Sequence, residues 1–166
     1  MQENKKALDA GCGSGFFSKF FCDNGMRTTS IDYSTEALAM TKNLTTDRAK
    51  ILQADLLNDN LYDKLNDQFD LIFSDGLLEH FTSKEQGAIL VNLRSVLKAD
   101  GVLITFVPNL WSPWQVIRPF IMKGIAETPF ISSTLSSIQI SNGFRIIEFG
   151  GINILPFRIS PALLWR

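Results

Sequence analysis

Seven residues near the start of the chain could bind a ligand through their backbone. They read Asp9-Ala10-Gly11-Cys12-Gly13-Ser14-Gly15, with glycines at alternate positions. Glycine lets the chain turn sharply and lets a ligand lie against bare peptide, and the amides that open the following helix point toward the same ligand. Asp32 follows 21 residues after Gly11, where the second strand of a doubly wound sheet would place a carboxylate near the hydroxyls of a ribose. The pattern indicates a nucleoside-bearing ligand, and the alternative is that Asp32 caps the helix after Ser34.

Two further places could contact the molecule that reacts with such a ligand. His80 is the only histidine, and with an unperturbed pKa of about 6.5 it could take a proton from an oxygen or nitrogen atom; the alternative is a structural histidine that holds its loop. Glu79 is interpreted as fixing that loop, and with Trp111 and Trp114 it is a candidate for substrate binding. The tryptophans belong to residues 108–131, which could form an apolar lid, pack on themselves, or dock on a membrane or a protein partner.

The elements that would position these residues alternate between strands and helices. Strands are expected at Lys6–Ala10, Thr28–Asp32, Lys50–Asp55, Phe69–Phe73 and Val102–Val107, and helices at Phe16–Asp23, 34–43, 61–65 and 83–97. Alternation at such short intervals predicts parallel strands joined by right-handed crossovers, that is, a doubly wound, mostly parallel α/β sheet in three layers.

Local signals refine these elements. The first helix is expected to turn Phe16, Phe17, Phe20 and Phe21 inward, and Ser83 and Gln86 form a capping box for the helix that Gly101 ends. Beyond residue 131, a helix is expected at Ser133–Ser141, a strand at Phe144–Phe149 and a short edge strand within Gly150–Leu155.

Composition places the chain among globular single domains of the cytoplasm. Its 166 residues are 45% apolar and carry a net charge of -1, which suits one domain and excludes a generally basic nucleic-acid binder. No stretch has the length of a membrane span, and no apolar secretory segment follows the start. Two cysteines cannot build a disulfide framework or a zinc site, so no metal is expected and the compartment is expected to be reducing. Residues 1–107 would form a core, 108–131 a lid and 132–166 a C-terminal region.

The glycine stretch also carries a resemblance to a known family. Leu8 to Gly15 is similar to the first motif of class I S-adenosylmethionine-dependent methyltransferases, which is spaced GxGxG, whereas nicotinamide-binding folds usually place a glycine where Phe16 stands. Later motifs of the small-molecule branch of that family resemble segments here in the same order: Asp32-Tyr33, Gln53 to Leu56, Phe69 to Phe81, and Lys98 to Leu103. The resemblance spans residues 6–107 and implies a Rossmann-like fold.

The resemblance implies a role for each matching residue. Gly11, Gly13 and Gly15, with Cys12 in the same loop, would hold the methionine part of the cofactor, and Asp9 would support the loop. Asp32 would accept from the ribose hydroxyls, and Asp55 from the adenine amino group, because carboxylates only accept hydrogen bonds. Tyr33 and Leu56 would bracket the adenine ring, and the backbone around Ser74 would meet the methionine amino group. An ordinary loop aspartate is the alternative for Asp55.

The expected activity is methyl transfer from S-adenosylmethionine to a small-molecule acceptor by in-line displacement, leaving S-adenosylhomocysteine. Members of the family usually carry helices before the first strand, whereas here that strand begins close to Met1. The chain is therefore interpreted as a trimmed methyltransferase core, and the alternative function is a non-catalytic or partner-dependent module that binds the cofactor. The identity of the acceptor atom and the oligomeric state stay open. A nucleic-acid methyltransferase is not expected, because Ser74-Asp75-Gly76-Leu77 follows the fourth strand and no basic stripe is found.

Overall fold

A five-stranded parallel sheet forms the centre of the computed structural model, which describes residues 4–112, 115 and 128–151. The strands lie in the order β3-β2-β1-β4-β5 and comprise β1 (Lys6–Ala10), β2 (Arg27–Asp32), β3 (Lys50–Gln53), β4 (Phe69–Asp75) and β5 (Leu97–Phe106). The order changes direction between β1 and β4, and ligands of such sheets bind beside that switch point, at the carboxyl ends of the strands.

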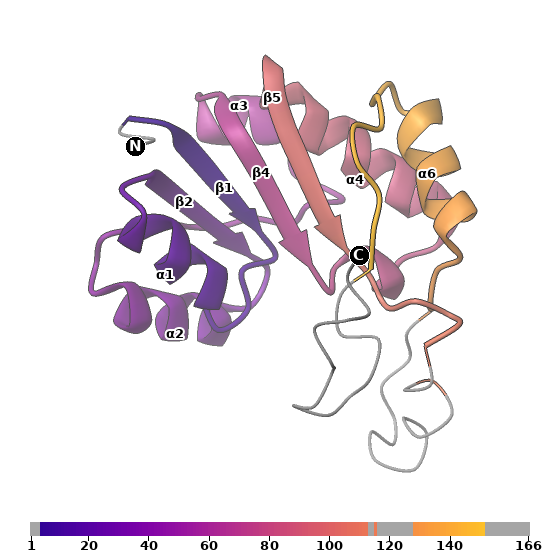
Figure 1. Cartoon of the computed structure of the whole chain (residues 1–166). Coiled ribbons are helices and arrows are strands. Elements are labelled where there is room, and N and C mark those ends of the chain that lie inside the picture. The colour runs from indigo at the N-terminus through magenta and orange to yellow at the C-terminus, as the bar shows by residue number, and fades with distance from the viewer. Residues whose placement is uncertain (1–3, 113–114, 116–127, 152–166) are drawn as a thin grey trace.

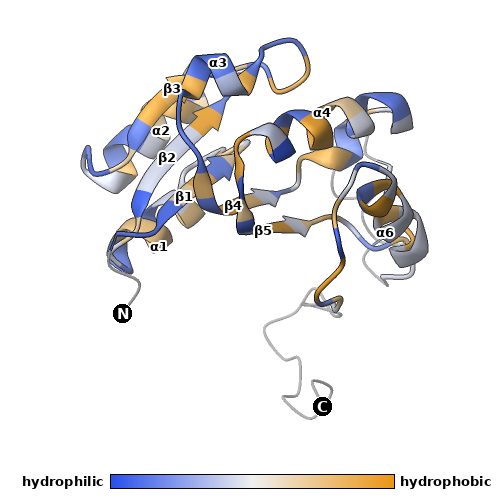
Figure 2. Cartoon of the chain, turned by 90° about the horizontal axis from the view of Figure 1, so that it is seen from above, coloured by the Kyte–Doolittle hydropathy of each residue, from blue (hydrophilic) through white to orange (hydrophobic). Residues whose placement is uncertain are grey.

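Helices cover both faces of the sheet and confirm the expected three layers (Figure 1). On one face lie α1 (Phe16–Asp23) and α2 (Thr35–Thr45); on the other lie α3 (Leu61–Leu65), α4 (Ser83–Ser95) and α6 (Ser132–Ser141). α4 carries hydrophobic residues beside hydrophilic ones (Figure 2), as expected of a helix with one side on the sheet. Within the described ranges, no helix combines the length and apolar character needed to cross a bilayer.

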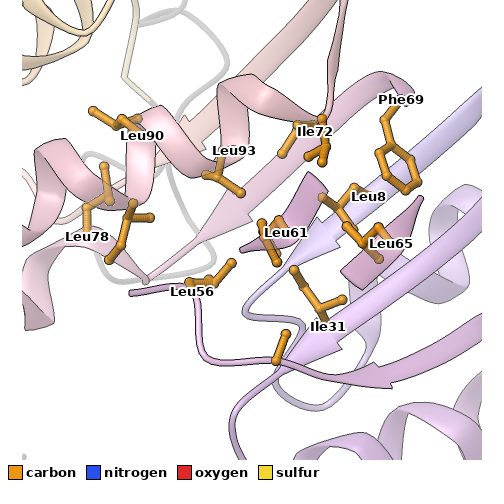
Figure 3. Close-up of a cluster of buried hydrophobic side chains, with 14 of the residues drawn as sticks. Leu8, Ile31, Leu56, Leu61, Leu65, Phe69, Ile72, Leu78, Leu90 and Leu93 are labelled. Carbon is orange, nitrogen blue, oxygen red and sulfur yellow. The ribbon is translucent and has the colours of Figure 1, made fainter. Parts of the chain in front are cut away.

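Two apolar clusters, one on each face, hold the layers together. The larger one packs β1, β2 and β4 against α3 and α4 (Figure 3), and Leu8, Ile31, Ile72 and Leu90 in it are fully buried. The smaller one lies under α1, where the ring centroid of Phe17 is 4.2 Å from that of Phe73. The clusters fix the carboxyl ends of β1, β2 and β4 beside one another, where the loops with chemistry begin.

The first helix buries fewer of its phenylalanines than expected. Phe21 is buried and Phe17 is half-buried, but Phe16 and Phe20 are 67% and 54% exposed, so the expectation that all four point inward is wrong. An eight-residue helix has one side on the sheet, and Ser18 occupies the centre of that side with a fully buried hydroxyl.

The capping box of α4 lies one residue earlier than expected. The Thr82 side chain accepts from the Glu85 N–H, and the Glu85 carboxylate accepts from the Thr82 N–H at 2.8 Å. Gln86 is buried instead, and its amide donates to the carbonyls of Leu78 (3.0 Å) and Phe81 (2.8 Å). Two capping patterns overlap in the sequence, and the burial of Gln86 decides between them.

Gly101 lies inside β5 and does not end a helix. A Cβ at this position would lie 2.9 Å from the Phe69 carbonyl oxygen and 2.7 Å from the Leu97 side chain. The parallel register between β4 and β5 also shifts between Phe69 and Leu71. Glycine therefore permits the close approach of two strands at an irregularity of the ladder, and β5 begins at Leu97 rather than at Val102.

The expected strand at Phe144–Phe149 is not formed. Residues 144–151 have no regular secondary structure, although Phe144 packs on the larger cluster. The expected edge strand within Gly150–Leu155 lies outside the described residues after Gly151. Alternating apolar residues predict a strand only where a partner strand supplies hydrogen bonds.

Candidate cofactor site

The glycine loop turns sharply between β1 and α1, and each glycine meets a different requirement. All three have positive φ angles, of 73° at Gly11, 51° at Gly13 and 84° at Gly15, a conformation that disfavours side chains. A Cβ on Gly13 would meet nothing within 4 Å, so this peptide borders open space. A Cβ on Gly15 would lie 2.7 Å from Thr41, so this glycine is required by close packing against α2.

Asp32 holds the glycine loop to the end of β2. Its Oδ2 accepts from the Gly13 N–H and its Oδ1 from the Ser34 N–H, both at 2.9 Å. The N-cap of α2 is Ser34 itself, whose Oγ accepts from the Ala37 N–H at 3.2 Å. Each carboxylate oxygen can accept a second hydrogen bond, so Asp32 organises the loop and can still accept from a ligand.

Asp9 is a buried carboxylate beneath the loop. Its side chain lies on the α1 face, and its Oδ2 accepts from the Ser18 hydroxyl at 2.5 Å, while Ser18 and Ser30 share a hydrogen bond of 2.7 Å. The pKa of Asp9 is raised to about 6. Burial raises it most, the hydrogen bonds with Ser18 lower it, and the nearby charges of Asp32 and Asp75 add smaller increases. A cation bound beside the loop would favour the charged form of this group.

The loop after β3 folds on its own aspartate. Asp55 Oδ1 accepts from the N–H groups of Leu57 (2.9 Å) and Asn58 (3.2 Å), and Oδ2 accepts from the Asn58 amide at 2.8 Å. These hydrogen bonds, that of the Asn58 side chain above all, hold the pKa of Asp55 below its ordinary value. The Leu56 side chain is 6% exposed and belongs to the larger apolar cluster (Figure 3), so little of it can contact a ligand. Tyr33 is 74% exposed.

The end of β4 approaches the glycine loop from the other side. Leu77 reaches over Gly11, where a Cβ would lie 3.2 Å from the Leu77 Cδ1. Ser74 is buried, and its hydroxyl donates to Thr105 at 3.4 Å. Asp75 follows it, and partial removal of water by the surrounding protein raises the pKa of Asp75. Residues 74–77, the last two of β4 and the two that follow, therefore lie beside the glycine loop at the switch point between β1 and β4.

Glu79 and His80 lie in a 3₁₀ turn, Leu78–His80, after this loop. Glu79 is buried, and its carbonyl accepts from the Thr128 N–H at 2.9 Å. His80 is exposed. The contact to Thr128 ties this turn to the second half of the 108–131 stretch.

The described ends of the expected lid are joined to each other. Leu110 donates to the Phe130 carbonyl at 2.9 Å, and Phe130 donates to the Pro108 carbonyl at 2.8 Å, while the Phe130 side chain is buried in the larger cluster. Trp111 is 77% exposed at this junction. Trp114 lies outside the described residues.

Sequence reasoning missed four residues that build the site. Ser18 donates to Asp9, and Ser30 shares a hydrogen bond with Ser18. Thr41 contacts the glycine loop, and Asp75 adds a charge at its edge. Thr41 could have been found, because Ala37, Thr41 and Thr45 recur every four residues on α2, which marks the inner side of a helix. Cys12, expected at the cofactor, is buried and turns its thiol to Thr41 at 3.4 Å.

Fold and site together define a Rossmann-like α/β domain with a glycine loop and an acid at the switch point of its sheet. Residues 8–105 match the family model described as methyltransferase domain, and the chain belongs to this family, whose cofactor is S-adenosylmethionine.

Individual proteins are similar over part of the chain. The malonyl-[acyl-carrier protein] O-methyltransferase of Hamiltonella defensa is 32% identical over 134 residues, which are 80% of this chain and 48% of the relative. The chain thus spans about half the length of this curated relative.

Solved structures share the fold. The methyltransferase bound to the Haloferax volcanii Trm112 activator has a TM-score of 0.77 and 20% identity, covering 99% of this chain and 72% of that one. Magnesium protoporphyrin IX methyltransferase from Synechocystis, solved with S-adenosylhomocysteine bound, has a TM-score of 0.72 and 20% identity, covering 89% of this chain and 68% of that one.

Proposed function

We propose that this chain transfers the methyl group of S-adenosylmethionine to a small-molecule acceptor by in-line displacement. The open peptide at Gly13 carries the proposal, because a ligand can lie where a Cβ would meet no atom within 4 Å. The carboxylates of Asp9 and Asp32 lie beside it and interact electrostatically. When bound, the cofactor supplies a methyl group on a positively charged sulfur, and ribose hydroxyls donate hydrogen bonds; both features suit neighbouring carboxylates.

The glycine loop and Asp32 would hold the ribose and methionine parts. Each Asp32 oxygen accepts one protein N–H, which leaves one acceptor site on each for the two ribose hydroxyls. The bare peptides of Gly11 and Gly13 would lie against the methionine part, and the backbone around Ser74 would accept from its amino group. Asp9 would supply negative charge from below without touching the acceptor.

The loop after β3 would hold the adenine. Asp55 Oδ2 accepts only from the Asn58 amide among the described residues and keeps an acceptor site for an exocyclic amine. The Leu56 N–H makes no hydrogen bond to another described residue. An acceptor beside a donor complements the edge of adenine, which has an amino group next to a ring nitrogen. The exposed ring of Tyr33 could cover the base, while Leu56 would act through its backbone.

The acceptor would lie near His80 and residues 108–131. His80 is exposed and Glu79 connects its turn to Thr128, so His80 is the candidate base, Glu79 a residue that shapes the pocket, and Trp111 and Trp114 candidates for apolar contact. The relative from Hamiltonella defensa is an O-methyltransferase, which supports an oxygen atom as the first acceptor to screen. Methyl transfer can proceed by alignment of the reacting atoms alone.

Titration calorimetry of the chain with S-adenosylhomocysteine tests the cofactor site, and a methyl-transfer assay against a panel of small-molecule acceptors tests turnover. Asp32→Ala is expected to weaken cofactor binding by more than about tenfold, since hydrogen bonds to a charged group contribute roughly 1.5–3 kcal/mol. Asp47→Ala is the matched control, because Asp47 is an exposed aspartate whose one ion pair within the described residues is with Lys42 at 3.5 Å. Equal affinities of both variants would contradict the assignment of Asp32.

A second candidate is a cofactor-binding module that needs a partner for turnover. Exposed apolar side chains favour it: Val102 and Ile104 of β5 are each 38% exposed, and Phe16 and Phe20 of α1 are exposed as well. This candidate predicts binding of S-adenosylhomocysteine without methylated product from any acceptor, and product formation by the isolated chain would exclude it.

A further inference from the structure

Thr41 contacts the glycine loop from α2, a helix that the sequence motifs do not connect with the cofactor. The side chain is fully buried, and its hydroxyl donates to the Gly13 carbonyl at 3.0 Å. The Cys12 thiol lies 3.4 Å from the same hydroxyl oxygen. Burial raises the pKa of Cys12 to about 12, so the thiol keeps its proton and can donate to Thr41, whose own proton goes to Gly13.

The residue Gly13 is consequently held on both sides. Its N–H donates to Asp32 at 2.9 Å, and its carbonyl accepts from Thr41 at 3.0 Å. Gly13 also has a positive φ of 51° and borders open space, so its own contacts do not select this conformation. The hydrogen bonds from β2 and α2 therefore determine the orientation of the peptides that would face the cofactor.

We propose that Thr41 is a positioning residue for cofactor binding, acting through the Gly13 carbonyl. The inference rests on the proposed cofactor site. With the Thr41 hydroxyl in place, the loop is arranged before the ligand arrives, and binding does not have to order it. Without the hydroxyl, the Gly13 carbonyl lies beside an apolar side chain and the loop is free to rotate away from the bound geometry.

Thr41→Val removes the hydroxyl and keeps the shape, so it is expected to weaken binding of S-adenosylhomocysteine by about fivefold to tenfold, the effect of one buried hydrogen bond. Thr41→Ser keeps the donor and is expected to bind close to wild type. Thr45→Val is the matched control, because Thr45 is fully buried one turn later on α2 and donates to the helix carbonyl of Thr41 at 2.8 Å.

The affinity for S-adenosylhomocysteine and the thermal unfolding midpoint of the three variants distinguish an effect on cofactor binding from an effect on the stability of the fold. We expect Thr41→Val and Thr45→Val to lower the midpoint to a similar extent, while only Thr41→Val weakens binding. Equal affinities of these two variants, or failure of serine to restore binding, would overturn the inference. If Thr41→Val fails to fold, the affinities of Thr41→Cys and Thr41→Ser are compared instead. The two side chains are similar in size, but only the serine hydroxyl is a strong donor, so the cysteine variant is expected to bind more weakly.

The outcome for the wild type distinguishes this inference from the proposed function. A folded wild-type chain that binds no S-adenosylhomocysteine refutes the cofactor site and the role of Thr41 with it. If the wild type binds S-adenosylhomocysteine and Thr41→Val binds it equally well, the role of Thr41 is refuted while the cofactor site stands.

Discussion

Replacing Asp9 by asparagine is expected to stabilise the fold at neutral pH and to weaken the binding of S-adenosylmethionine. In the folded chain, burial raises the pKa of Asp9 from 3.8 to about 6. A difference of about 2 pKa units corresponds to about 3 kcal/mol, at roughly 1.4 kcal/mol per unit. The folded state therefore holds a proton that the unfolded state has already lost between these two values.

The sign of the pH dependence follows from this difference. Because the folded pKa is raised, the contribution of Asp9 to stability falls as the pH rises from about 4 to about 6, and above pH 7 the full cost of a buried charge is present. Asparagine never ionises and can still accept from the Ser18 hydroxyl, which donates to Asp9 Oδ2 at 2.5 Å. The variant is therefore expected to match wild type near pH 4 and to exceed it by up to about 3 kcal/mol at pH 7.5.

Urea unfolding of both proteins at several pH values measures this difference, because the carboxylates that do not interact with Asp9 titrate equally in the two chains. A difference in unfolding free energy that stays constant from pH 4 to 7.5 would refute the reasoning. The same variant is expected to bind S-adenosylmethionine more weakly, and S-adenosylhomocysteine less so, because only the former carries positive charge on sulfur. Stability would then rise as binding falls.

Three further predictions follow from the geometry. Asp70→Asn is expected to give the opposite pH dependence, since the Lys6 N–H and the Lys98 and Lys5 ammonium groups hold the pKa of Asp70 well below its ordinary value; the stability that it contributes is present at neutral pH and lost in acid, so urea unfolding should show a deficit at pH 7 that vanishes at low pH. Gly13→Ala is expected to fold and lose cofactor binding in calorimetry, whereas Gly15→Ala should cost roughly 1–3 kcal/mol more in thermal unfolding, because its Cβ would lie 2.7 Å from the α2 backbone; equal stabilities would contradict the packing argument. His80→Ala is expected to reduce turnover by about a hundredfold or more with unchanged cofactor affinity if His80 is the base, and a loss below about tenfold would indicate a structural role.

The wrong expectations share a cause. At α4, two capping patterns overlap by one residue, and only the burial of Gln86 against the carbonyls of Leu78 and Phe81 selects Thr82 as the cap. At Gly101, glycine reads as a helix stop, but the Phe69 carbonyl across the ladder requires it. In both places the deciding contact comes from residues distant in the chain or from a buried side chain that periodicity does not single out.

The alternation of strands and helices up to residue 107 and the glycine loop after the first strand could be predicted from the residues alone. These depend on short-range physics: apolar periods, caps such as Ser34, and the positive φ angles that Gly11, Gly13 and Gly15 accept. The contacts that hold this loop come instead from residues that the folded chain brings together. Asp32 lies 19 residues from Gly13 and Thr41 lies 28. The first hydrogen bond depends on the pairing of β1 with β2 and the second on the packing of α2 against the loop, and neither contact is encoded by a local pattern.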